Sequence, residues 1–426
     1  MSILIKNVNV LTMETENGQL KAPFTADIVV EDGRITCIGS APEAEYDEVL
    51  DGSHRLAMPG LINAHGHAGM SLMRGFGDDM ELMSWLHDRI FPTEERLVEN
   101  DVLLGGRLAV LEMIKTGTTA FADMYFFCDK LAQAVEEGGI RASISQGMNF
   151  SPAERIQTAF ALNYKSATDR ITMMFGPHAP YTCSEEFLTA QAEVARESGI
   201  PIHIHLCETQ DEERQIKEKY GCTPVEFLRR CDFFRGNKVL AAHGVWLHDE
   251  DIEYLKDYDF SVASNPVSNL KLASGIAPVK KLLDAGINVA VGTDSVCSNN
   301  NIDMFEELRT ACLVAKVRDL DPLAVPAGTA LQLATVNGAK ALALSDLGVL
   351  REGAKADIIL IDTDQPHFFP RHDMISHLVY AASGKDVASV ICDGKIIMRD
   401  RQVLTLDEEK VMYEANEAAM RLCYSK

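Results

Sequence analysis

The amino-acid sequence predicts an α/β protein: a (β/α)8 barrel of the TIM type with a small β-sandwich built from both chain termini. From about residue 57 onward, apolar strand-like runs alternate with segments of helical periodicity, and polar residues follow the ends of nearly all these runs. The two chain ends contain only short alternating strands. We therefore expect the barrel over residues 57–349, and the small domain with a C-terminal helix over residues 1–56 and 350–426.

The strand candidates number eight, which is the number that closes a parallel barrel. They end in "GLINAH", "TAFADMY", "RASISQGMN", "ITMMFGPHAP", "IPIHIHLCET", "VLAAHGV", "FSVASNP" and "INVAVGTDS". Helical patterns separate them, for example at 94–116, where Lys115 and Gly117 are typical of a helix C-terminus. An open doubly wound sheet would also alternate, but no G-x-G-x-x-G follows the first strand.

Both chain ends differ from the middle of the sequence. Segments such as "ADIVVEDGRITCIG" and, within 357–404, "VASVICDGKIIMRDRQVLT" are alternating strands separated by Asp-Gly turns. The final segment, "LDEEKVMYEANEAAMRLCYSK", has the pattern of a closing helix. These features predict that the two ends meet in one small β-rich unit.

The composition excludes several classes of partner. Hydrophobic residues make up 46% and charged residues 24%, which is ordinary for a soluble globular protein. The formal net charge of -23 disfavours nucleic acid and anionic membrane surfaces as partners. The N-terminus lacks the apolar core of a signal peptide, and no run approaches the roughly 20 apolar residues of a membrane span. The ten cysteines are scattered without a C-x-x-C pair, so we expect reduced thiols and a cytoplasmic location.

Histidines and one aspartate gather at the ends of the predicted strands. They are His65, His67, His178, His205, His243 and Asp294. In a (β/α)8 barrel these ends share one face, where the chemistry takes place. His65 and His67 also face the same way along a strand, although an H-x-H pair alone could equally be two polar residues at a strand end. Five of the twelve histidines at strand ends favour one shared site.

This set of side chains suits a metal-dependent hydrolase. Imidazoles together with one carboxylate favour Zn²⁺, with Fe²⁺ as the second choice. A divalent ion lowers the pKa of bound water to about 7. The carboxylate can accept the proton of that water, and Glu208, three residues after His205, can deliver a proton to the substrate. The pattern therefore predicts metal-assisted hydrolysis.

The sequence resembles the amidohydrolase superfamily, in the branch of aminohydrolases and chlorohydrolases that act on nitrogen heterocycles. The matching segments are "PGLINAHGH", "GPHAPYTCS", "HIHLCET", "AAHGV", "SNPVSNLKLASG", "GTDSVCSNNNIDMFEELR" and "GAKADIILID". They occur in order and cover almost the whole chain. Within the branch the sequence is most similar to 5-methylthioadenosine/S-adenosylhomocysteine deaminases.

The resemblance implies one metal ion held by four ligands: His65, His67, His205 and Asp294. His205 is the strand ligand because the family places it three residues before the glutamate, and His203 would lie one layer deeper with a structural role. Glu208 would protonate the purine N1 while hydroxide generated at the metal attacks C6. His243 would orient the attacking water and stabilise the tetrahedral intermediate, and Asp294 would carry the water proton towards the leaving ammonia.

The resemblance also implies residues that contact the substrate. Glu94 would accept hydrogen bonds from ribose hydroxyls, Trp85 would lie near the apolar side of the pocket, and His178 would contact the purine or ribose. Arg155 lies where relatives place an arginine for the amino-acid tail of S-adenosylhomocysteine. Each has a structural alternative: a helix N-terminal carboxylate for Glu94, a core anchor for Trp85, a strand-end role for His178 and a solvated cation for Arg155.

Two positions depart from the family pattern. Gly66 stands between the first two ligands, where relatives usually carry a side chain such as threonine, and we expect looser local packing there. Gln146 stands where some relatives have an arginine, which weakens the case for a substrate with a carboxylate. The resemblance therefore favours 5-methylthioadenosine or adenosine over S-adenosylhomocysteine, as substrates of a hydrolytic deamination to the inosine analogue and ammonia.

Other interpretations remain open at this point. A deaminase or chlorohydrolase of another heterocycle, such as guanine, an oxidised purine, a pterin or a triazine, would have the same metal site. Amidohydrolases with two metal ions bridge them with a carbamylated lysine at the end of the fourth strand. Here that strand ends "MMFGPHAP" without a lysine, so the resemblance implies a site with one metal ion. An inert barrel that binds a ligand would also keep the fold. The sequence is compatible with a homo-oligomer but does not specify one.

Overall fold

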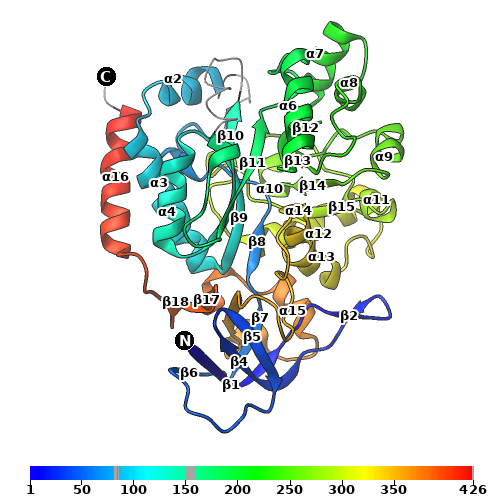
Figure 1. The fold of residues 1–426 in the computed structure, drawn as a ribbon. Helices are drawn as coiled ribbons and strands as arrows, with labels where there is room; N and C mark the ends of the chain where they lie inside the picture. The colour runs from blue at the N-terminus through cyan, green and yellow to red at the C-terminus, as the bar shows by residue number, and fades with distance from the viewer. Residues whose placement is uncertain (81–83, 85, 149–159, 425–426) are drawn as a thin grey trace.

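The computed structural model describes residues 1–80, 84, 86–148 and 160–424. Its centre is a sheet of eight parallel strands that follow one another in chain order (Figure 1). They are β8 (Leu61–Asn63), β9 (Thr118–Tyr125), β10 (Arg141–Met148), β11 (Ile171–Pro177), β12 (Ile202–Leu206), β13 (Val239–His243), β14 (Phe260–Ser264) and β15 (Asn288–Val291). The sheet closes where the Ala64 N–H donates to the Val291 carbonyl and the Asp294 N–H donates to the His65 carbonyl, both at 2.9 Å. The predicted (β/α)8 barrel is confirmed.

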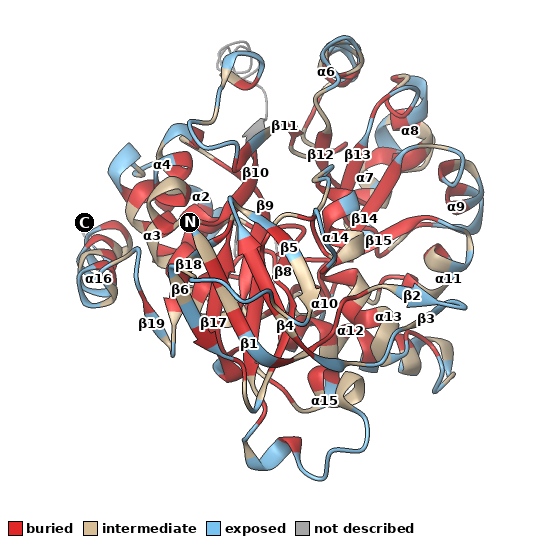
Figure 2. Ribbon diagram, turned by 60° about the horizontal axis from the view of Figure 1, so that its bottom comes forward, coloured by how far each residue is buried: buried red, intermediate tan, exposed pale blue. Residues whose placement is uncertain are grey.

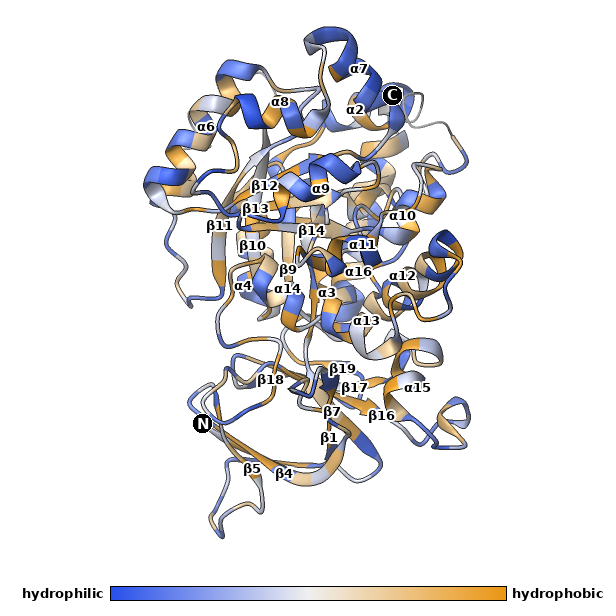
Figure 3. Ribbon diagram, turned by 90° about the vertical axis from the view of Figure 1, so that its right-hand side faces the viewer, coloured by the Kyte–Doolittle hydropathy of each residue, from blue (hydrophilic) through white to orange (hydrophobic). Residues whose placement is uncertain are grey.

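Helices surround the barrel and cover the outer face of its strands (Figure 2). They are α3 (Glu99–Thr116), α4 (Cys128–Gly138), α6 (Glu185–Ser198), α7 (Gln210–Tyr220), α8 (Pro224–Arg230), α9 (Asp249–Leu255), α10 (Pro266–Lys271), α11 (Val279–Asp284), α12 (Met304–Asp319), α13 (Ala327–Leu333) and α14 (Val336–Ala341). The strands β8, β9 and β12 to β15 are buried at every residue, because one face packs inside the barrel and the other against helices. The outer helices α6, α7 and α9 carry both hydrophilic and hydrophobic residues (Figure 3).

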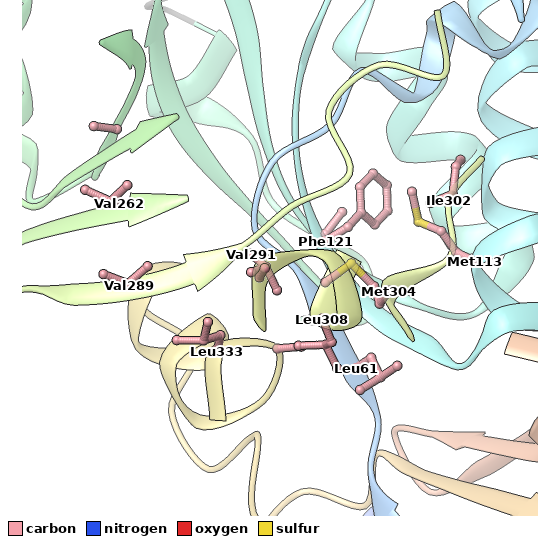
Figure 4. Packing of buried hydrophobic residues seen from close by; sticks show 14 of the residues in the cluster. Leu61, Met113, Phe121, Val262, Val289, Val291, Ile302, Met304, Leu308 and Leu333 are labelled. Carbon is pink, nitrogen blue, oxygen red and sulfur yellow. The ribbon is translucent and has the colours of Figure 1, made fainter. Parts of the chain in front are cut away.

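Helix α12 covers the seam at which the barrel closes. It contacts both β8 and β15, the first and last strands of the sheet. Figure 4 shows Met304 and Leu308 of this helix among the buried side chains of Leu61, Phe121 and Val291. Apolar burial of this kind contributes roughly 1.5–3 kcal/mol per large side chain. The seam is therefore held by packing as well as by the backbone hydrogen bonds.

The two chain ends build one mixed sheet of nine strands below the barrel (Figure 1). Its members are β1 (Ser2–Val10), β4 (Phe24–Glu31), β5 (Arg34–Gly39), β6 (Glu48–Asp51), β7 (Arg55–Pro59), β16 (Ile358–Asp362), β17 (Val387–Cys392), β18 (Lys395–Arg399) and β19 (Gln402–Val403). The N-terminal and C-terminal strands join where β7 and β16 pair antiparallel. Shorter elements are the hairpin β2 (Thr15–Glu16) and β3 (Gln19–Leu20), α15 (Met374–Tyr380), η3 (Pro366–Phe368) and η4 (Gly384–Asp386). The domain boundaries at 56/57 and 349/350 stay a prediction.

The last helix, α16 (Glu408–Tyr424), lies along the barrel beside α3 (Figure 1). It also contacts η1 (Ala68–Met73), the segment that directly follows His67. Its residues Ala415, Ala418 and Leu422 belong to the same apolar cluster as Met70 and Tyr125. The C-terminus therefore supports the part of the barrel that carries the first histidine pair. No helix among the described residues has the length and apolar character needed to cross a membrane.

A buried ion pair joins the floor of the barrel to the terminal sheet. Arg141, the first residue of β10, is 2% exposed and donates to Asp357 at 2.9 and 3.1 Å and to Asp393 at 2.7 Å. Both aspartates belong to the C-terminal half of the terminal sheet region. The contact therefore ties the barrel to strands that follow it by more than 200 residues in the sequence.

We expect Arg141→Met to destabilise the protein by about 3–5 kcal/mol, because it leaves the buried carboxylate of Asp357 without its cation. Arg107→Met is the matched control, since Arg107 pairs with Glu137 at the surface, where such pairs contribute about 0–1 kcal/mol. Urea unfolding followed by circular dichroism measures both variants. Equal losses in the two variants would contradict the assigned role of Arg141.

Candidate metal and active site

A cavity of about 320 Å³ lies at the carboxyl ends of the barrel strands. The predicted site residues that line it are Glu94, His67, His178, His205, Glu208, His243 and Asp294. His65 lies directly beneath them and is fully buried. These side chains come from five different strand ends and from the segment before α3, so the barrel brings together residues that are far apart in the sequence.

Three imidazoles and one carboxylate converge on a single point. Nε2 of His65 and Nε2 of His67 lie 3.4 and 3.2 Å from the same oxygen, Oδ1 of Asp294. Nε2 of His205 lies 3.4 Å from Nε2 of His67. Nε2 of His65 is buried without a hydrogen-bond partner among the described residues, which is costly unless another group satisfies it. These donors fit a divalent cation, and they belong to the two groups with metal-binding geometry in the described part of the chain.

The hydrogen bonds of the other ring nitrogens prepare the histidines for metal binding. Nδ1 of His67 donates to the carbonyl of Met124, and Nδ1 of His205 donates to the carbonyl of His178 at 2.8 Å. A carbonyl can only accept, so each Nδ1 carries a proton and each Nε2 is the nitrogen that faces the shared point. Sequence reasoning did not anticipate this role for two backbone carbonyls.

His203 extends the same arrangement to His65. Nδ1 of His65 lies 2.8 Å from Nε2 of His203, and Nδ1 of His203 lies 3.2 Å from Oγ of Ser145. Because the Ser145 hydroxyl donates to the Asp123 carbonyl, its oxygen accepts from His203. His203 then accepts from Nδ1 of His65, and Nε2 of His65 is left free. The geometry places His203 one layer below the ligands, where it orients His65.

Burial and the shared carboxylate set the charges of these groups. Burial lowers the pKa of His65 to about 4, and it lowers the pKa of His203 and His205 well below the usual value, so these rings are neutral. Burial alone would raise the pKa of Asp294, but the imidazoles of His65 and His67 beside its Oδ1 hold it well below its ordinary value. His67 differs: burial lowers its pKa, but the Asp294 carboxylate raises it to about 9, so a metal ion bound here would displace a proton from this ring.

Three strand-end residues adopt left-handed backbone conformations that aim side chains into the cavity. Cys207, His243 and Asp294 have φ values of 54°, 75° and 60°. Such conformations are unfavourable for residues other than glycine and concentrate at functional sites. At Cys207 the bend redirects the chain after β12, and Glu208 follows it into the cavity.

Glu208 is held by a second carboxyl group that sequence reasoning missed. The backbone N–H groups of Cys207 and Glu208 donate to the two oxygens of Glu212 at 3.0 and 2.8 Å. Thr209 caps α7 by accepting from the Glu212 N–H. The pattern T-x-x-E over Thr209–Glu212 was the available signal, since it is typical of a helix start. Burial raises the pKa of Glu208, which favours its protonated form.

His243 and Asp294 are positioned by the segment that follows β14. The side chains of Asn265 and Asn269 lie 3.2 and 2.9 Å from Nδ1 of His243. Its other nitrogen, Nε2, lies 3.7 Å from Oε2 of Glu208. The hydroxyl of Ser268 donates to Oδ2 of Asp294 at 2.6 Å. Oδ1 of Asp294 is thereby left to the histidines.

The substrate-side predictions have mixed outcomes. Glu94 and His178 line the cavity, whereas Trp85 and Arg155 lie outside the described residues. Nδ1 of His178 lies 2.9 Å from Oγ1 of Thr182, and burial lowers the pKa of His178 to about 4, so the ring is neutral. Gln146 belongs to β10, but its side chain is not among the described ones.

The structure explains why Gly66 is compatible with the ligand pair. A Cβ added there would meet its nearest neighbours at 3.7 Å, which is ordinary contact. The position therefore has room for the Cβ of the larger residue that relatives carry. The positions of His65 and His67 therefore do not depend on a glycine at residue 66.

The fold and this donor set define a metal-dependent hydrolase of C–N bonds with its site at the mouth of a (β/α)8 barrel. The chain belongs to the amidohydrolase family, whose model matches residues 56–397. It is 48% identical over 431 aligned positions to a 5'-deoxyadenosine deaminase of Methanosarcina mazei, covering 99% of this chain and 98% of the relative. It is also 48% identical to a 5-methylthioadenosine/S-adenosylhomocysteine deaminase of Pelotomaculum thermopropionicum, with 99% of each chain covered.

A solved structure has the same fold as this chain. A zinc-bound adenosine deaminase of Xanthomonas campestris superposes with a TM-score of 0.92 at 30% identity, covering 99% of this chain and 98% of that one. The resemblance to deaminases of this family, predicted from the sequence motifs, is confirmed.

We expect Ser268→Ala to weaken metal affinity by about 10–100-fold, because Oδ2 of Asp294 keeps only the longer hydrogen bond from Ser298, at 3.3 Å, and the carboxylate can rotate away from the histidines. Ser143→Ala is the matched control: this buried serine bonds Thr172 at 2.8 Å and does not contact the site. Competition with a chromophoric zinc chelator measures both affinities. An unchanged affinity in Ser268→Ala would contradict its role.

Proposed function

We propose that this chain catalyses the hydrolytic deamination of an adenosine-type nucleoside to the inosine analogue and ammonia. The observation that carries the proposal is the position of Glu208 and His243 beside the His/Asp cluster, in a cavity that also presents Glu94. A cation site and a carboxyl group whose pKa is raised suit the chemistry at C6, and a separate carboxylate suits the sugar hydroxyls of a nucleoside. The names of the relatives support the same substrate class.

The amidohydrolase family is metal-dependent, and we propose zinc as the ion of this member. The chemistry of the ligands suits it, and zinc is bound in the adenosine deaminase described above. His65, His67, His205 and Asp294 would hold the ion. When bound, such an ion supplies a water of lowered pKa and stabilises negative charge that develops on oxygen.

The protein's own residues would handle the protons. Deamination adds water across the C6–N1 bond of the purine and then expels the amino group as ammonia. Burial raises the pKa of Glu208, which favours the protonated form, and from this form Glu208 would give a proton to N1. Nε2 of His243, next to Glu208, would hold the attacking water in line with C6. Asp294 would accept a proton from the water and pass it to the leaving amine, and the proton left on the new C6 oxygen would return to Glu208.

The cavity favours a nucleoside with an uncharged 5′ substituent. Glu94 would accept hydrogen bonds from ribose hydroxyls. Apolar side chains line the same cavity, among them Ile90, Phe91, Phe126 and Leu272. Among the described residues these surroundings suit a methyl or methylthio group better than an amino-acid tail, since a desolvated charge needs a partner. We therefore propose 5'-deoxyadenosine, 5-methylthioadenosine and adenosine ahead of S-adenosylhomocysteine.

We expect the zinc-loaded protein to release ammonia from these adenosine nucleosides, with loss of adenine absorbance. A panel that adds S-adenosylhomocysteine, guanine and a chlorotriazine tests the alternative that another heterocycle is the substrate. Turnover of guanine or triazine with no change in any adenosine compound would overturn the proposed substrate class. Glu94→Ala separates the substrate classes further, because it should lower the turnover of nucleosides and leave the turnover of nucleobases without ribose nearly unchanged.

We expect Glu208→Gln to lower kcat by about 10²–10⁴-fold, because the amide cannot supply the proton for N1. Bound metal, measured by plasma emission spectrometry, should stay at the wild-type level, since Glu208 is not among the proposed ligands. Glu213→Gln is the control, a neighbouring glutamate that pairs with His248 at the surface. A Glu208→Gln enzyme with full activity would contradict the proposed mechanism.

The remaining predictions concern the setting of the enzyme. We propose a small-molecule partner only, with neither nucleic acid nor membrane, in keeping with the net charge of -23. The cytoplasmic location and the homo-oligomer stay predictions.

A further inference from the structure

Tyr125 is a buried polar residue of the cavity that the mechanism does not use. It ends β9, is 5% exposed, and its hydroxyl donates to Oε1 of Glu94 at 2.8 Å. Glu94 is the last residue of the short helix α2 (Phe91–Glu94). Among the described residues, the other oxygen of Glu94 has no hydrogen-bond partner. The contact therefore fixes one oxygen of the carboxyl group and leaves the second for a ligand.

The tyrosine ring is locked against the segment that carries the metal ligands. A Cβ added at Gly69 in η1 would lie 2.4 and 2.8 Å from Cδ1 and Cε1 of Tyr125, so the ring packs directly on the glycine backbone. A Cβ at Gly105 of α3 would meet the Gly69 carbonyl at 2.4 Å. Two glycines thus allow α3, η1 and the ring to stack closely. The ring cannot move away from η1 without opening this packing.

Two consecutive residues of β9 hold the two ends of the site. The carbonyl of Met124 accepts from Nδ1 of His67, a proposed metal ligand, and the next residue, Tyr125, holds Glu94. The end of one rigid strand thereby sets the distance between the reacting end of the cavity and Glu94. A nucleoside must match this distance, because its purine C6 and its ribose are joined by a rigid base.

The protonation states agree with this direction of the hydrogen bond. Burial raises the pKa of Tyr125 well above its usual value, and the Glu94 carboxylate raises it further, so the hydroxyl keeps its proton. Burial also raises the pKa of Glu94, whereas the hydrogen bond from Tyr125 opposes that rise and favours the carboxylate form. Tyr125 therefore helps to keep Glu94 an acceptor.

We propose that Tyr125 is a positioning residue that holds Glu94 as an acceptor for the ribose 2′- and 3′-hydroxyls, and so makes the enzyme select ribonucleosides. This inference rests on the proposed function. The proposed function concerns the chemistry at C6. This inference assigns specificity for the sugar to Tyr125 and Glu94, which the chemistry at C6 does not require.

The test compares adenosine with 2′,3′-dideoxyadenosine in the zinc-loaded enzyme and in Tyr125→Phe. The wild type should have a higher kcat/KM for adenosine than for dideoxyadenosine. Tyr125→Phe should lower this ratio about tenfold, through a higher KM for adenosine. The values for dideoxyadenosine should stay within about twofold, since that substrate offers Glu94 no hydroxyl. A merely structural role would lower activity towards both substrates alike and would contradict the proposal.

Glu94→Gln provides an independent check that does not depend on the folding of Tyr125→Phe. This variant should lose the preference for adenosine to at least the same extent. If Tyr125 acts through Glu94, the double variant should match Glu94→Gln alone. Thermal unfolding and bound zinc are measured for every variant. Additive losses in the double variant would overturn the proposal.

The outcomes separate this inference from the proposed function. A wild type that deaminates neither nucleoside would overturn both. A wild type that deaminates both equally well, or a Tyr125→Phe variant that keeps the full preference, would overturn the role of Tyr125 and leave deamination intact.

Discussion

The site depends on the closure of the barrel between β8 and β15. The Asp294 N–H donates to the His65 carbonyl at this seam, and the Asp294 side chain reaches His65 and His67 from the same position. One short stretch of parallel pairing therefore joins residues separated by 229 positions along the chain, the difference between 65 and 294. Because α12 packs over both strands, the apolar core stabilises the pairing that the metal site requires. The pairing that closes the barrel therefore also brings the proposed metal ligands together.

Backbone carbonyls orient two of the proposed metal ligands. His67 and His205 are held through Nδ1 by carbonyls of residues at neighbouring strand ends, and His65 is held through His203. Strand carbonyls occupy fixed places in a barrel, so the rings they orient are also fixed. Preorganisation of this kind lowers the cost of collecting several neutral imidazoles and one carboxylate in a dry site. It also explains how several buried histidines coexist there.

Strand ends and ligand spacing were predictable from the sequence, because both follow from local periodicity. An H-x-H pair, a histidine three residues before a glutamate, and polar residues after apolar runs need no three-dimensional information to be noticed. The fold class, eight strands and terminal sheet followed in the same way. Glu94 and His178 were placed by resemblance, and the structure brings both to the cavity.

Positioning contacts were not predictable, because they depend on the approach of distant segments. The ring of Tyr125 packs on Gly69 while its hydroxyl donates to Glu94. Ser268, after the neighbouring strand β14, donates to Asp294, and the Glu212 carboxylate accepts from the backbone N–H of Glu208. Tyr125 and Ser268 have no signal that distinguishes them from ordinary buried polar residues, and the T-x-x-E pattern at Glu212 indicates only a helix start. The C-terminal helix was expected with the small domain, yet it lies along α3, because its apolar face packs there.

The central claim is that three histidines and Asp294 form one metal site at the barrel seam. The most direct measurement is a crystal structure of the zinc-loaded protein, with anomalous scattering at the zinc edge. We expect one ion with His65, His67 and His205 nitrogens and an Asp294 oxygen at about 2.0–2.2 Å. Two ions, or a single ion held by Glu208 in place of Asp294, would contradict the account.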